Sequence, residues 1–311
     1  MKLVRGFSER DTSVLGGAVS IGNFDGVHRG HARIIERLRA LAQRVAGPAV
    51  VFTFEPHPIQ LLRPDAVPPP LTRLDDKLEL LEKLHVDVAV VYPTDRELLQ
   101  LSPTAFFQQI LVEGLAARAL AEGPNFYFGK DRAGDIPLLQ TFCQAQRMVL
   151  EVVPLLQIEH EYVSSSRIRN LLRIGQVAEA NRLLTRPYQL RGTVVHGAGR
   201  GARLGFATAN LEAIETILPA SGVYAARAIT ATGSWPAAVN IGANPTFGEQ
   251  QTKVEAHLLD FSENLYGQSV KLELLQRLRG TTPFPSVDAL REQLARDLNA
   301  VRETVARFPA S

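Results

Sequence analysis

The pattern of apolar residues changes near Pro187, and this change constrains the fold more than any other feature of the chain. Before it, short apolar runs alternate with segments in which apolar residues recur at the helical period. After it, short apolar runs are separated by glycine-rich turns. At 311 residues, the chain exceeds one typical core and suits two domains. We therefore expect a first domain over residues 1–186 and a second over residues 187–311.

Strand and helix patterns alternate through the first domain. Its predicted strands are the apolar runs Ala18–Ile21, Ala49–Phe54, Val86–Val91 and Val149–Val153. The helical pattern between the first two strands is broken by Gly47-Pro48. A further helical pattern runs from Leu74 to Leu84, and Ser102-Pro103 is a typical N-cap and first helical residue. This alternation predicts an α/β, Rossmann-like domain in which helices cover both faces of a parallel sheet.

The second domain has the pattern of an antiparallel fold. Short apolar runs separated by turns lie at Leu190–Val195, Val223–Ile229, Ala237–Ile241, Val254–Leu259 and Val270–Leu275. This spacing predicts an antiparallel β-barrel or sandwich. A final helix begins at Ser286 and carries Leu290, Leu294 and Leu298 on one stripe.

Composition excludes several classes of protein. Lys and Arg total 34 against 32 Asp and Glu, so the net charge of +2 gives little support for nucleic-acid binding. The single cysteine, Cys143, cannot form an internal disulfide and fits a reducing compartment. The N-terminal residues lack the apolar run of a signal peptide, and no segment approaches the roughly 18 apolar residues of a membrane span. We expect a soluble cytoplasmic protein, a monomer or weak homo-oligomer, that binds neither nucleic acid nor membrane.

The strongest functional signal is GNFDGVHRGH, which directly follows the first predicted strand. Its glycines permit a tight turn in which backbone amides approach phosphate closely, and the helix that follows would point its free amides at the same place. Two histidines on one face of the first helical turn could stabilise charge that builds on an α-phosphate during in-line displacement. Either histidine alone is more typical of a solvated helix start, but the pair in this context favours catalysis. The candidate ATP-binding residues are Gly22, Phe24, Asp25, His28 and His31.

A second polar cluster, Val163–Arg169, follows the last predicted strand of the sheet. Its hydroxyl groups could cap a helix, and its arginines supply fixed positive charge suited to phosphate oxygens. A well-capped surface helix is an equally good interpretation of the cluster alone. Ligands bind at the carboxyl ends of strands in open α/β folds, where this cluster should lie. The candidate phosphate-binding residues are Ser164, Ser165, Arg167 and Arg169.

Two further segments of the first domain carry weaker signals. The turn Phe54–Pro58 holds His57, and a structural turn is its favoured interpretation. The loop Gly123–Gly129 is unusually aromatic, and its rings could stack on a flat ring system, although burial under the sheet explains them nearly as well. No P-loop sequence is present in the chain.

The second domain carries a glycine loop, a polar strand and a carboxylate. The loop has more glycine than a hairpin needs and could fold over phosphates; its candidates are Gly197, Gly199, Gly201, Leu204 and Gly205. Thr208 and Asn210 alternate onto one side of a strand, and their oxygens suit magnesium on a nucleotide, although such pairs are usually solvent-facing. Glu255 shares a strand face with His257 and could take a proton from an attacking hydroxyl, or could be an ordinary charged strand residue.

These motifs, in this order, resemble those of the bacterial bifunctional riboflavin kinase/FAD synthetases over nearly the whole chain. In the first domain the resemblance rests on GNFDGVHRGH, FTFEPHP, GPNFYFGKDRAGD and VSSSRIR. In the second it rests on RPYQLRG, GAGRGARLGFATAN, SGVYAARA, NIGANPTFG and VEAHLLDF. The resemblance implies a nucleotidylyltransferase domain that joins FMN to the AMP part of ATP, giving FAD and diphosphate. It implies that an antiparallel β-barrel with a C-terminal helix follows and phosphorylates riboflavin to FMN.

The resemblance also implies roles for single residues. His28 and His31 would be the catalytic histidines of adenylyl transfer. Glu255 would be the base that acts on the ribityl hydroxyl of riboflavin, and Thr208 and Asn210 would hold Mg²⁺ with its ATP. The flavin side of the first domain would include Pro56, His57, Asn125 and Phe126.

Three positions depart from the family pattern. Ala207 stands where proline is usual, Tyr127 where arginine is common, and Ser166 where threonine is usual. The first could loosen the strand that presents Thr208, and the second removes a partner for the FMN phosphate.

Two rival interpretations are an adenylyl- or cytidylyltransferase whose barrel only binds flavin, and a regulatory or nucleic-acid-binding barrel. The presence of Glu255 and Asn210 disfavours the first rival. The second predicts a basic, aromatic strand face, which this barrel lacks.

Overall fold

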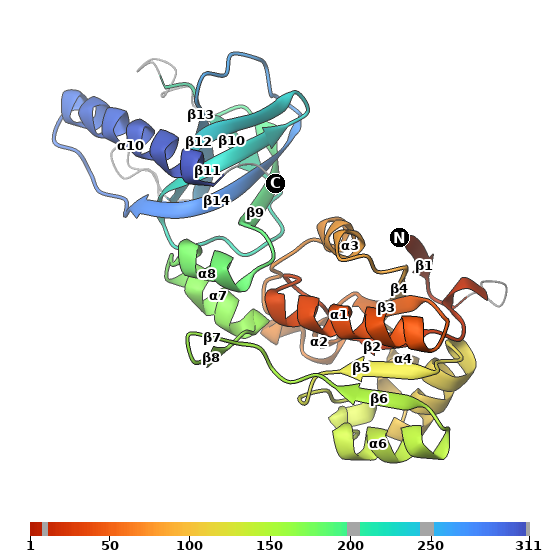
Figure 1. The fold of residues 1–311 in the computed structure, drawn as a ribbon. Helices are drawn as coiled ribbons and strands as arrows, with labels where there is room; N and C mark the ends of the chain where they lie inside the picture. The colour runs from red at the N-terminus through yellow and green to blue at the C-terminus, as the bar shows by residue number, and fades with distance from the viewer. Residues whose placement is uncertain (8–11, 198–205, 243–251, 309–311) are drawn as a thin grey trace. The chain divides into compact units, whose positions relative to one another are not determined.

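The computed structural model describes residues 1–7, 12–197, 206–242 and 252–308. Contacts divide the chain into two compact units (Figure 1). The first unit comprises Met1–Pro68 and Thr72–Ser164, and the second comprises Pro69–Leu71 and Ser165–Ser311. This division falls at residues 164/165, whereas the sequence pattern predicts a change of architecture at residue 187.

The first unit is built on a six-stranded parallel sheet in the described residues. Its strands are β1 (Lys2–Arg5), β2 (Ala18–Ile21), β3 (Ala49–Glu55), β4 (Val88–Pro93), β5 (Ala119–Glu122) and β6 (Val149–Val152). Their order is β1-β4-β3-β2-β5-β6, and all neighbouring pairs run parallel. From β2 the chain adds β3 and β4 on one side, and then returns to place β5 and β6 on the other side of β2. Ligands of open α/β sheets bind at such a reversal, beyond the carboxyl ends of the strands.

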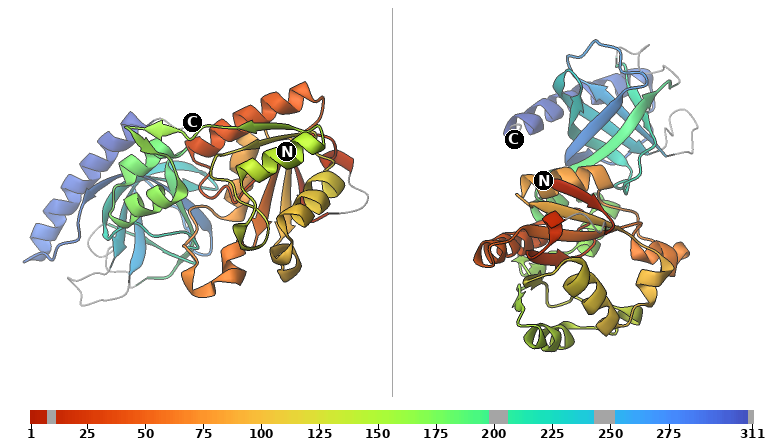
Figure 2. Two further views of the ribbon diagram at one scale, coloured as in Figure 1. Left: turned by 90° about the horizontal axis from the view of Figure 1, so that it is seen from below. Right: turned by 90° about the vertical axis from the view of Figure 1, so that its right-hand side faces the viewer.

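Helices cover both faces of this sheet, as predicted (Figure 2). On one face, α1 (Arg29–Arg44) and α3 (Leu74–Lys83) bury leucine and isoleucine residues against the strands. On the other face lie α5 (Pro103–Phe106), the π-helical segment η3 (Phe107–Gly114) and α6 (Ile136–Ala145). The remaining short elements are η1 (Thr12–Val14), α2 (Pro58–Leu62), η2 (Pro64–Ala66), α4 (Arg96–Gln100), η4 (Lys130–Arg132), β7 (Gln157–Ile158) and β8 (Glu161–Tyr162).

Local signals placed several of these elements correctly. β2 has the predicted bounds, and Ser102 caps α5 by accepting the backbone N–H of Ala105 at 3.2 Å. The strand predicted from Val86 instead begins at Val88, and the carboxylate of Asp87 just before it accepts the Ala49 N–H at 2.8 Å. The buried thiol of Cys143 lies on α6, where burial raises its pKa to about 11, so it is a packing residue.

The second unit is a closed antiparallel barrel, which confirms the barrel and excludes the sandwich. Its strands are β9 (Tyr188–Val195), β10 (Ala209–Glu212), β11 (Gly222–Thr230), β12 (Gly233–Gly242), β13 (Lys253–Leu258) and β14 (Ser269–Arg279). Their order around the barrel is β10-β13-β12-β11-β14-β9 (Figure 1). Buried and partly buried residues alternate strictly along β9 and β13, so one set of side chains fills the barrel and the other faces outward.

Two helices before the barrel, α7 (Ser165–Arg173) and α8 (Val177–Leu183), belong to the second unit. Asn181 on α8 donates to the Leu274 carbonyl at 2.8 Å and accepts the Tyr188 N–H at 2.7 Å. The Ala220 N–H donates to the Leu172 carbonyl of α7 at 3.0 Å. These bonds explain why the contact division precedes the change in sequence pattern.

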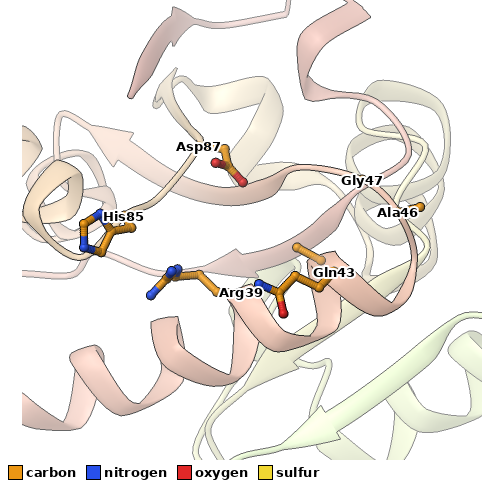
Figure 3. A pocket seen from close by; sticks show the side chains of 7 residues that line it. Arg39, Gln43, Ala46, Gly47, His85 and Asp87 are labelled. Atoms are coloured by element: carbon orange, nitrogen blue, oxygen red, sulfur yellow. The ribbon is translucent and has the colours of Figure 1, made fainter.

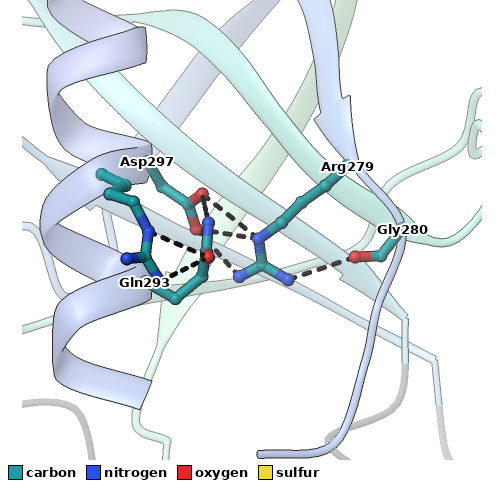
Figure 4. A network of polar contacts seen from close by, with 5 residues as sticks. Arg279, Gly280, Gln293 and Asp297 are labelled. Atoms are coloured by element: carbon teal, nitrogen blue, oxygen red, sulfur yellow. Dashed lines mark hydrogen bonds and ion pairs between the residues drawn. The ribbon is translucent and has the colours of Figure 1, made fainter. Parts of the chain in front are cut away.

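The final helix, α10 (Val287–Arg307), packs on the outside of the barrel. The helix was predicted to begin at Ser286, which is its N-cap and accepts the Ala289 N–H at 3.1 Å. Its most buried residues are not the predicted leucine stripe but Asp297, Val301 and Thr304. Asp297 accepts hydrogen bonds from Arg279 of β14 and from Gln293, which ties the helix to the barrel wall (Figure 4). No helix in the described residues is long and apolar enough to cross a membrane.

Candidate active sites

The turn between β2 and α1 lies at the carboxyl edge of the sheet. The Gly22 N–H donates to the Phe52 carbonyl of β3 at 3.0 Å, and Asp25 accepts the Thr72 N–H at 3.1 Å. Phe24 and Val27 have left-handed φ angles of 48° and 40°, which such side chains rarely adopt. Because its backbone is strained, this turn depends on the bonds that hold it.

Phe24 and Gly22 of the turn have a structural role as well as being candidate ligand-binding residues. Phe24 is 3% exposed and packs in the core between sheet and helices. A Cβ at Gly22 would lie 3.2 Å from the Phe24 ring, so glycine lets this ring approach the backbone. The part of this turn that is suited to face a phosphate is therefore its backbone.

His28 and His31 lie together at the start of α1. His28 is the N-cap, and its Nδ1 accepts the His31 backbone N–H at 3.2 Å. Their rings are stacked, with centroids 3.6 Å apart and planes inclined by 14°. A Cβ at Gly30 would lie 3.1 Å from the His28 ring, so the glycine between the histidines gives this ring its space. The predicted sharing of one helix face is confirmed.

Burial keeps both histidines neutral at neutral pH. It lowers the pKa of His28 to about 4, against a smaller opposing effect of a backbone hydrogen bond. It lowers the pKa of His31 well below its ordinary value, and His28 and Lys77 lower it further. Since Nδ1 of His28 accepts a hydrogen bond, the proton of the neutral ring lies on Nε2, which is a donor. Among the described residues, Nδ1 of His31 is buried without a hydrogen-bond partner.

Lys77 is a functional candidate that the sequence analysis missed. It lies on α3 and is 7% exposed. Burial lowers its pKa, while the negative charges of Asp25 and Glu55 raise it. Its position three residues before Leu80 and four before Leu81 puts it on the buried stripe of the helix, which was the available signal.

The other flavin-side candidates of the first unit follow β3 and β5 at the same edge of the sheet. His57 caps α2 through an Ile59 N–H bond of 3.1 Å, which agrees with the structural-turn interpretation; Pro56 precedes it. Phe126 stacks on Phe128 with centroids 5.6 Å apart and is partly buried, whereas Asn125 is exposed. The guanidinium of Arg132 lies 4.6 Å above the ring of exposed Tyr127.

The serine–arginine cluster is divided between the two units. Ser164 ends the first unit, and the carbonyl of Val163 beside it lies 3.7 Å from where a Gly30 Cβ would stand. Ser165, Arg167 and Arg169 lie on α7 of the second unit. Arg169 is 7% exposed and donates to the Pro69 carbonyl at 2.9 Å, so one of its donors is used within the protein.

The candidates of the second unit form a row across the barrel wall. Asn210 on β10 is paired in register with Glu255 on β13, and Glu255 is paired with Asn240 on β12. Their strand neighbours Val254 and Ala256 are buried, so the row lies on the outer face. The sequence did not indicate Asn240 as a site residue, because the pairing of residues on neighbouring strands cannot be predicted from one strand alone.

Gly197 provides the space for the Asn210 carboxamide. A Cβ at position 197 would lie 2.1 Å from Nδ2 and 2.6 Å from Cγ of Asn210. His257 bonds through Nδ1 with the Ala207 carbonyl at 2.7 Å, so it holds the segment that precedes β10. Thr208 is partly buried in this segment. Gly199, Gly201, Leu204 and Gly205 lie outside the described residues.

The donor set suits a hard cation bound with a nucleotide. Threonine hydroxyl and asparagine carbonyl oxygens are ligands that Mg²⁺ accepts alongside substrate phosphates. The Asn210 carboxamide lies directly against the backbone of Gly197. Within the described residues, no group of three or more His, Cys, Asp or Glu could hold a metal ion alone.

A surface hollow of about 440 Å³ lies at the opposite end of α1 (Figure 3). It is lined by Arg39, Ala42, Gln43, Ala46, Gly47, His85 and Asp87. None of the predicted site residues lines it, and the Asp87 carboxylate already accepts the Ala49 N–H.

Comparisons with known proteins match both halves of the chain. A family model described as FAD synthetase matches residues 11–167, and one described as riboflavin kinase matches residues 184–305. Two relatives are named bifunctional riboflavin kinase/FMN adenylyltransferase. The Pseudomonas fluorescens protein is 36% identical over 98% of both chains, and the Haemophilus influenzae protein is 34% identical over 97% of this chain and 98% of its own.

A solved structure has the same fold over nearly the whole length. It is described as a macrolide-efflux protein from Streptococcus pneumoniae, with a TM-score of 0.87 and 28% identity over 97% of this chain and 99% of its own. That description names a different activity, whereas both family models and the named relatives agree with the motifs. The chain belongs to the family of bifunctional riboflavin kinase/FMN adenylyltransferases.

Proposed function

We propose that His28 and His31 carry the adenylyl transfer of this enzyme and that Glu255, Thr208 and Asn210 carry its kinase reaction. The enzyme phosphorylates riboflavin to FMN with its C-terminal part and adenylylates FMN to FAD with its N-terminal part. The stacked histidine pair at the head of α1 is the observation that supports the first assignment most. The Asn210–Glu255–Asn240 row supports the second.

In adenylyl transfer, an oxygen of the FMN phosphate attacks the α-phosphorus of ATP. The bond from that phosphorus to the bridging oxygen breaks, and diphosphate leaves. Negative charge builds on the α-phosphate oxygens, where the Nε2–H of neutral His28 and the first amides of α1 donate hydrogen bonds. A neutral ring keeps its proton throughout, so it acts by stabilising charge rather than by transferring a proton.

In the kinase reaction, the ribityl hydroxyl of riboflavin attacks the γ-phosphorus of ATP. Glu255 accepts the hydroxyl proton, and ADP leaves. Thr208 and Asn210 would hold Mg²⁺, which neutralises phosphate charge when it is bound. Asn240 stands beside Glu255 in the row and can hold the carboxylate or the hydroxyl in place. His257 keeps the Ala207–Thr208 segment against the strand.

The separation of the two reactions tests these assignments. With riboflavin, ATP and magnesium, the purified protein should form FMN first and FAD after it, as followed by chromatography. His28→Ala should lower FAD formation by roughly 10²–10³ and leave FMN formation intact, the cost of losing one donor to the transition state. Glu255→Ala should impair FMN formation and spare FAD formation from added FMN. Near-normal activity of either variant in its own reaction contradicts the role given to that residue.

We also propose that the protein acts in the cytoplasm as a monomer or weak homo-oligomer, with the two activities divided near residue 187. The lone, buried cysteine supports a protein without disulfides. Light scattering across a concentration series tests the oligomeric state. Separate expression of residues 1–186 and 187–311 tests the division. The division at residue 187 is wrong if both of these pieces are inactive while the pieces from a cut at residues 164/165 are both active.

A further inference from the structure

The central strands of the first unit part at the carboxyl edge of the sheet. β2 and β5 are paired only at Ala18↔Ala119 and Val19↔Leu120. β5 nevertheless stays paired with β6 as far as Glu122↔Val152, and the Val153 N–H donates to the Glu122 carbonyl at 2.8 Å. β2 therefore lacks its backbone partner on one side over its last two residues. This gap lies where the strand order reverses.

The side chain of Glu122 bridges this gap. Its Oε1 accepts the backbone N–H of Ile21 at 2.7 Å, so a side chain takes the place of the missing ladder bond. Glu122 is 3% exposed, and without this acceptor the Ile21 N–H would be buried and unpaired. On the other side of β2, the next residue, Gly22, donates to the Phe52 carbonyl. The end of β2 is thus held on both sides, by a backbone bond to β3 on one side and by the side chain of Glu122 on the other.

Burial raises the pKa of the Glu122 carboxyl well above its ordinary value, and the Ile21 N–H lowers it by less. Among the described residues, no charged group shifts this pKa. A protonated carboxyl still offers one acceptor oxygen, which the Ile21 N–H uses, together with one donor.

The bond stands directly before the strained turn of the adenylyl-transfer site. Ile21 is followed by Gly22, and the left-handed residues Phe24 and Val27 lead to the N-cap His28. A turn held against its own conformational preference relaxes when one of its anchors is removed. A small displacement at its start would move the His28 Nε2–H away from the α-phosphate.

We propose that Glu122 is a positioning residue for adenylyl transfer, because its carboxyl oxygen replaces the missing β2–β5 ladder bond and so holds the turn that carries His28. The inference rests on the role proposed above for His28. Glu122 acts through its bond to Ile21 and through the turn that follows.

Two substitutions test the proposal, with the kinase reaction as an internal control. Glu122→Gln keeps an acceptor and a donor without a titrating group, and Glu122→Leu keeps the bulk and removes the acceptor. At pH 7, Glu122→Leu should lower kcat of FAD formation on the order of tenfold, in proportion to one lost buried hydrogen bond, and leave riboflavin phosphorylation unchanged. Glu122→Gln should stay within about twofold of the natural protein. Glu151→Gln, on the neighbouring strand, breaks only a partly exposed ion pair with Arg37 and should change neither reaction.

The pH profile separates positioning from general stability. As pH rises through the raised pKa, Glu122 ionises in a buried site, and adenylyl transfer of the natural protein should fall. Glu122→Gln cannot ionise and should lack this pH-dependent decline, which remains a test if Glu122→Leu does not fold. A Glu122→Leu enzyme with normal kcat overturns the proposal, and so does a Glu122→Gln enzyme with the same pH-dependent decline as the natural protein. Unimpaired FAD formation by His28→Ala would instead overturn the proposed function on which it rests.

Discussion

The backbone N–H of His31 donates to Nδ1 of His28 across the first turn of α1, and this bond leaves the His28 proton on Nε2. The histidine pair is thereby set up as a neutral donor and not as a cation. The buried Lys77 on α3 lies close enough to this pair for its charge to lower the pKa of His31.

The pH dependence of adenylyl transfer should reflect the lowered pKa of His28. Protonation of this ring would break its N-cap bond, since a charged ring has no acceptor at Nδ1. We expect activity to persist as pH falls through 6.5 and to be lost only near pH 4, where His28 titrates. A pH profile of kcat/KM for FAD formation from added FMN checks this expectation. It is contradicted if activity of the natural protein already falls near pH 6.5 and His28→Gln does not show this fall.

Folding stability should depend on the same residue. Below pH 6.5 the unfolded chain binds a proton at His28, whereas the folded chain does so only near pH 4. Stability is therefore fully present above pH 6.5 and falls with pH across this window, by up to about 3 kcal/mol. Urea unfolding of the natural protein and His28→Gln at pH 7 and pH 4.5 should show a smaller acid loss in the variant. Equal losses would place the titration elsewhere.

Removal of the Lys77 charge should impair the first reaction alone. Lys77→Met keeps most of the buried side chain but leaves Asp25 and Glu55 without the compensating cation. It also removes a charge that lowers the His31 pKa. We expect FAD formation to fall on the order of tenfold, about 1.4 kcal/mol in the barrier, with riboflavin phosphorylation unchanged. Lys83→Met, at the exposed end of the same helix, is the control. Equal rates of FAD formation by Lys77→Met and Lys83→Met would contradict a role for Lys77 in adenylyl transfer.

A methyl group at Gly197 should impair the kinase reaction. The new Cβ would stand 2.1 Å from Nδ2 of Asn210, so the carboxamide must turn away from its present position. Gly197→Ala should lower kcat/KM of riboflavin phosphorylation on the order of tenfold and leave FAD formation from added FMN intact. Gly280→Ala, where a Cβ meets nothing closer than 3.9 Å, should have no effect. A fully active Gly197→Ala enzyme would show that the Asn210 orientation is not needed.

The ion pair beneath α10 should contribute to stability rather than to either reaction. Asp297 is almost fully buried and accepts hydrogen bonds from Nε and Nη2 of Arg279, which is partly exposed. Asp297→Ala should lower the free energy of unfolding by about 2 kcal/mol, less than for a fully buried pair because solvent reaches Arg279. Asp288→Ala breaks a surface pair with Arg291 and should cost under about 0.5 kcal/mol. Urea unfolding measures both, and equal losses would contradict the assignment.

The parts of the fold that depend on local pattern were predictable from the sequence. β2 has its predicted bounds, Ser102 caps its helix as expected, and the final helix starts where it was predicted, since these signals lie within a few residues. The division between the units was not visible, because α7 and α8 join the barrel through long-range bonds such as Asn181 to Leu274.

The candidate sites divide in the same way. The His28–His31 pair follows from helical spacing, so its stacking was foreseeable. Lys77, Glu122 and Asn240 are distinguished by burial or by pairing with a neighbouring strand, and neither property can be predicted from their own segments. A lysine on a leucine stripe was the strongest signal that the pattern offered.

Glu255 lies on the outer face of a barrel whose interior is filled by Val254, Ala256 and Leu258 of the same strand. Alternate positions of β13 thus have independent tasks: one set maintains the fold, and the other is free to carry chemistry. Substitutions at the outward positions can change or abolish a reaction while the barrel keeps its packing. A wall of this kind lets an active site diverge without the fold having to change with it.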